Sequence, residues 1–170
     1  MRTSYAILLL LFLMTFGIPA LAQVATSQSN EQTAICTFPD DAEISVRYLP
    51  VEYDKKTEPP PGKAWAPGGM PIYLFTPIEL LVGNTAIPTG AYSIYTIPNK
   101  GTWVLVINKN VAQGASYDEK QDLVRINMET VKAIVPNKPL TVTLGHIAPK
   151  VCSLQIVFGD TGAWTELKEK

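Results

Sequence analysis

Apolar and polar residues alternate with a period of two along most of this chain, and such alternation is typical of β-strands with one buried face. The clearest example is residues 87–109, where two β-favouring runs flank a turn-forming cluster at residues 98–101. The first run alternates, whereas the second, which opens with Trp103, is continuously apolar. This stretch predicts a hairpin in the core, with Trp103 among the buried residues.

The same alternation recurs in shorter runs separated by residues that favour turns. These runs are residues 33–38, 42–49, 71–75, 78–82, 123–131, 140–144, 151–158 and 163–167. Residues 52–69 include three successive prolines and predict a long loop, and residues 110–121 predict a loop or one short helical turn. No amphipathic helix is indicated. The pattern therefore predicts an all-β fold, an antiparallel β-sandwich of about eight to ten short strands with little helix.

The N-terminal residues have the features of a signal peptide. A basic residue precedes the apolar run 6–12, and residues 20–22 fit the Ala-x-Ala cleavage pattern. We expect cleavage after Ala22 and a periplasmic or secreted location. A membrane anchor is the alternative, but Gly17 and Pro19 interrupt the run before it comfortably spans a bilayer.

The remaining chain has the size and composition of one globular domain. We expect a signal peptide at residues 1–22, a flexible leader at residues 23–33 and a single domain at residues 34–170, with no membrane span after cleavage. Hydrophobic residues make up 46% of the sequence and charged residues 17%. With 14 basic and 15 acidic residues, the chain gives no electrostatic reason to expect nucleic acid or an anionic membrane as a partner.

The two cysteines, Cys36 and Cys152, both lie in the part that would be exported. An even pair in an oxidising compartment predicts a disulfide. Each cysteine also shares a strand face with apolar residues, so both sulfurs are expected to point into the interior. Two buried free thiols, or a metal site with too few ligands, are the alternatives.

The sequence offers no recognisable catalytic or metal-binding pattern. His146 is the single histidine, and its position at the end of a predicted strand suits a rim residue as well as a general base. The acidic residues at 118–122 match no calcium loop, and the glycines at 68–69 lack the partners of a phosphate-binding loop. We therefore predict no catalytic residue, no cofactor and no metal, and the sequence favours a protein that is not an enzyme.

An ordered set of motifs across residues 83–125 gives the chain a resemblance to a known family. Its members are Gly83, Pro88, Gly90, Tyr92, Ile97 with Pro98, Trp103, Asn108 with Lys109, Tyr117 with Asp118, Asp122 and Arg125. In this set the chain resembles a bacterial secreted family known as domain of unknown function 2911 (DUF2911). The resemblance implies a secreted β-domain and adds no reaction.

The chain departs from that family pattern in one segment. Relatives typically carry a Trp-Arg-x-Gly-Ala-Asn motif, whereas this chain has Trp65 followed by Ala-Pro-Gly-Gly. If the motif forms a polar site in relatives, that site is lost or altered here. Within the shared set, Asp122 and Arg125 can pair and fasten the loop after Lys109 to the sheet. A structural role for this pair is favoured over a place in a binding groove.

The functional hypothesis is an exported, non-enzymatic module that binds a small molecule, a glycan or an envelope protein. Amphipathic side chains in loops are its candidate contacts. The candidate ligand surface consists of Trp65, Tyr117, Asp122 and Arg125. One alternative is a hydrolase-like enzyme that uses two carboxylates from Asp118, Glu119 and Asp122. Another is a structural accessory of an envelope assembly.

Overall fold

The computed structural model describes residues 30–170 except residues 67–68, 115 and 137. This part of the chain contains eleven strands, the short 3-10 helices η1 (Lys55–Thr57) and η3 (Glu119–Gln121), and no α-helix. No helix in these residues is long and apolar enough to cross a membrane. The predicted signal peptide, residues 1–22, and most of the predicted leader lie outside the described residues.

The strands follow the predicted runs closely. They are β1 (Gln32–Thr37), β2 (Glu43–Tyr48), β3 (Ile72–Thr76), β4 (Leu80–Val82), β5 (Thr85–Ile87), β6 (Gly90–Asn99), β7 (Thr102–Asn108), β8 (Asp122–Lys132), β9 (Lys138–Ala148), β10 (Val151–Gly159) and β11 (Thr161–Glu169). All pairs are antiparallel, in the order β1-β2-β3-β6-β7-β8-β11-β10-β9, and β4 pairs with both β5 and β11. The predicted hairpin at residues 87–109 is β6–β7, and the predicted helical turn in residues 110–121 is η3.

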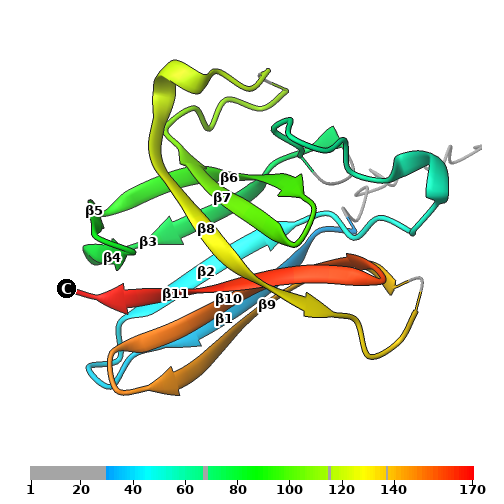
Figure 1. Ribbon diagram of the computed structural model, residues 1–170. Coiled ribbons are helices and arrows are strands. Elements are labelled where there is room, and N and C mark those ends of the chain that lie inside the picture. Colours follow the sequence, from blue (N-terminus) through cyan, green and yellow to red (C-terminus); the bar gives the residue numbers. More distant parts are fainter. Residues whose placement is uncertain (1–29, 67–68, 115, 137) are drawn as a thin grey trace, which may run out of the picture.

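Strand β8 makes this one continuous sheet. Its first half pairs with β7 as far as Met128, and its second half, from Glu129, pairs with β11. Figure 1 shows β8 crossing diagonally from the layer of β6 and β7 to the layer of β9, β10 and β11. Because the end strands β1 and β9 also lie against each other, the sheet is a nearly closed, barrel-like structure.

The predicted β-sandwich is therefore wrong, although the all-β antiparallel class is confirmed. A sandwich has two separate sheets, whereas the eleven residues of β8 are enough to serve two partner strands in succession. The predicted count of strands also falls short by one. The additional strand is β5, most of which lies between the predicted run at residues 78–82 and the predicted hairpin. It forms because Gly83, with a φ of 60°, opens a two-residue turn that pairs Thr85 with Val82.

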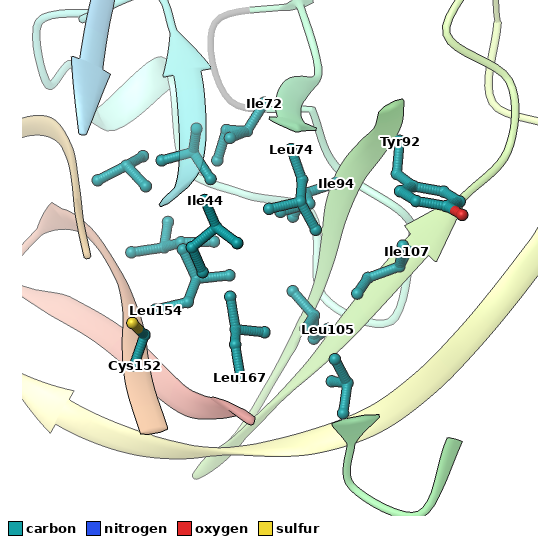
Figure 2. Packing of buried hydrophobic residues seen from close by; sticks show 14 of the residues in the cluster. Ile44, Ile72, Leu74, Tyr92, Ile94, Leu105, Ile107, Cys152, Leu154 and Leu167 are labelled. Atoms are coloured by element: carbon teal, nitrogen blue, oxygen red, sulfur yellow. The ribbon is translucent and has the colours of Figure 1, made fainter. Parts of the chain in front are cut away.

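The core fills the space that the curved sheet encloses. Side chains from β2, β3, β6 and β7 meet those from β10 and β11 there, as Figure 2 shows for Ile44, Leu74 and Leu154 among others. Trp103 is only 4% exposed, which confirms the prediction that it belongs to the core. We refer below to the sheet surface turned away from this core as the outer face.

The predicted disulfide is present between Cys36 on β1 and Cys152 on β10. Both cysteines are buried, and their Cα atoms are 6.4 Å apart. Since β10 is the neighbour of β9, the bond ties the two ends of the sheet together where β1 and β9 form no strand pair. A backbone hydrogen bond of 2.8 Å from Leu140 on β9 to Val51, just after β2, adds a second link.

Candidate functional site

Asp122, the first residue of β8, is the centre of a polar network on the outer face. Its Oδ2 accepts a hydrogen bond of 2.6 Å from the Tyr117 hydroxyl and another of 2.6 Å from the Arg125 Nε. Its Oδ1 accepts a bond of 2.7 Å from the Asn108 Nδ2. We call these four residues the Asp122 network. The Asp122 side chain is only 9% exposed, so the three donors replace water around its charge.

The loop of residues 109–121 begins and ends at this network. Asn108 is the last residue of β7 and faces Asp122 in the strand register, with a β-bulge beside it. The Lys109 backbone N–H donates to the Gln121 carbonyl at 3.0 Å, and the Asp118 carboxylate caps η3 by accepting from the Lys120 backbone N–H. The ends of the loop are therefore held together by hydrogen bonds within the chain.

The loop covers part of the outer face of β6 and β7. The Tyr117 ring packs on Tyr95 with ring centroids 4.9 Å apart, and the Ser93 hydroxyl donates to the Asn110 carbonyl at 2.8 Å. Ser93, Tyr95 and Val106 are all buried although none belongs to the enclosed core. The loop thus forms a second, smaller layer outside the sheet.

The protonation states in the Asp122 network follow from its burial beneath the loop. Burial, and then the hydrogen bond to Asp122, raise the pKa of Tyr117 to about 12, although Arg125 acts in the opposite direction. The hydrogen bond to Asp122 also raises the pKa of Arg125. Tyr117 is therefore a neutral donor, and Arg125 is a cation, at physiological pH.

Stability is expected to fall as the pH rises from 10 to about 12, because the folded protein holds the Tyr117 proton up to a higher pH than the unfolded chain does. Below pH 10 both the folded and the unfolded state keep this proton, so the full contribution of Tyr117 to stability is present. Urea unfolding across this range, monitored by tryptophan fluorescence, tests the prediction. Tyr117→Phe should make the slope shallower, without abolishing it, since burial also raises the pKa values of Tyr92 and Tyr95. An unchanged slope in this variant would contradict the assignment.

A groove of about 320 Å³ lies on the outer face beside the loop. We call it the outer groove. It is lined by Glu31, Arg47, Met70, Tyr73, Phe75, Ala91, Val111 and Gln113. Strands β2, β3 and β6 supply its floor, and residues 111 and 113 of the loop supply a wall. The Arg47 guanidinium carbon lies 4.8 Å from the centroid of the Phe75 ring.

The outer groove and the Asp122 network share one row of side chains. Across five neighbouring strands the register aligns Arg47, Tyr73, Ser93, Asn108 and Asp122. The first two positions belong to the groove, and the last two belong to the network. The sequence reasoning missed the groove. The sequence feature that could have indicated the groove is the pair of aromatic residues Tyr73 and Phe75, which occupy outward positions of a predicted strand.

A smaller hollow of about 240 Å³ lies between β8 and β11. It is lined by Gly83, Asn127, Glu129, Trp164, Thr165, Glu166 and Lys168. Glu166 and Lys168 form an ion pair across 2.7 Å. Its lining is more polar than that of the outer groove, and Trp164 is its one aromatic residue.

Three of the four predicted contact residues come together, and Trp65 does not join them. Trp65 pairs with Thr96 as an isolated β-bridge, and its ring packs on Phe158 and Trp103 with centroids 5.2 and 6.2 Å apart. Tyr117 instead packs on Tyr95, the neighbour of Thr96 in β6. Adjacent residues of a strand point to opposite faces, so Tyr95 points to the outer face and Thr96 to the core. Trp65, which is paired with Thr96, therefore also lies on the core side of the sheet. Pro67 and Gly68, in the segment that departs from the family motif, lie outside the described residues.

The other residues considered for chemistry have structural partners or exposed positions. Glu119 pairs with Arg125 at 3.0 Å, and the second oxygen of Asp118 accepts from the Gln121 side chain at 3.3 Å. His146 is exposed on β9. Within the described residues, no group of three or more His, Cys, Asp or Glu side chains is placed to hold a metal ion.

Comparison with known proteins gives a family and no function. No curated protein and no solved structure matches the chain. A family model described as "Protein of unknown function (DUF2911)" matches residues 29–166, which include β1 to β10, the first six residues of β11 and the whole Asp122 network. The chain therefore belongs to the DUF2911 family.

Proposed function

We propose that this protein is an exported binding module that holds a small, mainly apolar ligand in the outer groove. The observation that carries the proposal is the outward-facing aromatic floor formed by Tyr73 and Phe75. Met70 and Val111 extend this apolar surface and are 39% and 42% exposed. A volume of 320 Å³ is at the lower end of the range of about 300 to 1,000 Å³ typical of small-molecule sites.

In this proposal the Asp122 network positions the groove wall and does not contact the ligand. It fixes both ends of the loop that carries Val111 and Gln113. The network includes Asn108, Tyr117, Asp122 and Arg125, all members of the motif set by which the chain resembles its family. These residues would therefore support binding indirectly, by holding in place the loop whose residues Val111 and Gln113 form the groove wall.

The hydrolase-like alternative has less support from the geometry. Asp118, Glu119 and Asp122 each hold a partner of the same chain through a hydrogen bond or an ion pair. A two-carboxylate mechanism needs both groups open to substrate or water. Glu119 is 72% exposed, but Asp122 is 9% exposed and both of its oxygens accept hydrogen bonds from the same chain. Export is supported by the predicted signal peptide together with the disulfide, since disulfides persist in oxidising compartments.

Filling the groove should weaken binding of an apolar ligand. The neutral dye phenylnaphthylamine is expected to bind the wild-type protein saturably, with a rise in fluorescence, and to bind Ala91→Trp at least about tenfold more weakly because the indole occupies the space. Thr143→Trp, at an exposed position of β9, is the matched control and should bind the dye like the wild type.

Circular dichroism and thermal melting show whether both variants keep the fold. The proposal is overturned if folded Ala91→Trp binds the dye as tightly as the control, or if the wild type binds none.

A further inference from the structure

We infer that the ligand of the outer groove is a small amphiphile with a carboxylate group, and that Arg47 binds this carboxylate. The inference rests on the proposed function, because it assigns a chemical class to the occupant of the same groove. It is carried by the placement of one cation on an otherwise apolar and aromatic floor.

Arg47 has no carboxylate partner among the described residues. It is exposed on β2, opposite Tyr73 of β3, and none of the ion pairs in the described part of the chain includes it. Its guanidinium contacts the Phe75 ring, an arrangement that restrains the side chain while its N–H groups stay able to donate. A restrained guanidinium loses less entropy when it binds a carboxylate with two parallel hydrogen bonds.

The neighbours of Arg47 require the rest of the ligand to be apolar. Met70, Tyr73 and Val111 offer hydrocarbon and ring surface that gains by being removed from water. Arg47 is exposed, but an apolar ligand body would exclude water from the groove and so lower the local dielectric, which strengthens a hydrogen bond between opposite charges. A ligand with an apolar body and one anionic end meets both requirements, whereas an alkyl cation would face Arg47 with like charge.

Glu31 provides an internal test of this charge preference. In the β1–β2 register Thr33 faces Arg47, and Glu31, two residues earlier and just before β1, lines the same groove as Arg47. The negative charge of this lining residue would repel the carboxylate of the ligand. Neutralising Glu31 should therefore strengthen binding, an effect not expected from a site that recognises only apolar surface.

The experiment uses displacement of phenylnaphthylamine by octanoate, octanol and octylammonium, which share one alkyl chain and differ in charge. For the wild type we expect octanoate to bind about tenfold or more tightly than octylammonium and more tightly than octanol. Arg47→Gln should weaken octanoate binding about tenfold and leave octanol binding within about twofold. Glu31→Gln should strengthen octanoate binding by about twofold or more.

Lys132→Gln is the matched control, since it removes an equal charge at an exposed position at the far end of β8. It should leave the affinity for octanoate unchanged. The inference is overturned if octanoate binds no more tightly than octanol, or if Arg47→Gln and Lys132→Gln weaken it equally; in either case dye binding still supports the groove. If the wild type binds no dye, the proposed function itself is overturned, and the inference about Arg47 is overturned with it.

Discussion

Replacing Cys36 and Cys152 together by alanine is expected to lower the free energy of unfolding by about 4 to 5 kcal/mol. The disulfide joins residues 116 positions apart, and in the chain-entropy model a loop of that length strongly restricts the unfolded state. Alanine is preferred to serine because both positions are buried, and a hydroxyl there would lack an assured partner. For a domain of this size the melting temperature should fall by roughly 10 to 20 °C.

Differential scanning calorimetry and urea unfolding of the double variant measure this effect. Wild-type protein unfolded with and without a thiol reductant provides a second measurement that leaves the sequence unchanged. The reduced wild type and the double variant should agree closely. If neither loses more than about 1 kcal/mol, the bond contributes little and the closure of the sheet depends on packing alone.

Asp122→Ala is expected to lower the free energy of unfolding by about 3 kcal/mol, the second largest effect. The substitution removes the acceptor for Asn108, Tyr117 and Arg125 at once, and an unpaired buried donor costs about 1 to 3 kcal/mol. Part of this cost is relieved because Arg125 is 38% exposed and can turn to water. Urea unfolding measures the loss, and dye affinity should also decrease because the groove wall loses its anchor.

Glu119→Ala is the matched control for this prediction. Glu119 is paired with the same Arg125, but its side chain is 72% exposed, and exposed ion pairs contribute about 0 to 1 kcal/mol. A small effect at Glu119 beside a large one at Asp122 would assign the stability to the covered carboxylate. Equal effects would show that the network acts only as surface charge.

Much of the fold could be predicted because alternation reports which side chains point inward. It identified β6 and the inward cysteines whose pairing the structure contains, and the continuously apolar run of β7 identified the buried Trp103. Alternation could not identify the closed sheet, because β8 alternates in the same way against β7 and against β11. The choice between two sheets and one depends on where that strand changes partner, at Met128 and Glu129.

The candidate site was partly predictable for a similar reason. Tyr117, Asp122 and Arg125 are close in the sequence, so one loop brings them together. The contribution of Asn108 depends on the register of β7 and β8, and the outer groove depends on the register of the three strands β2, β3 and β6 and on the position of a loop. Trp65 was misleading because a tryptophan in a loop gives no indication of which side of the sheet its ring will pack on.

The distance in sequence between the two cysteines also bears on how the chain matures. Cys36 is synthesised early, and its thiol stays unpaired until Cys152 has been synthesised 116 positions later. Because the chain contains only two cysteines, no incorrect pairing exists within one molecule, and a simple thiol oxidant is enough to form the bond. A disulfide between two copies of the chain is therefore the misfolded product to expect, and dilution of the protein should suppress it.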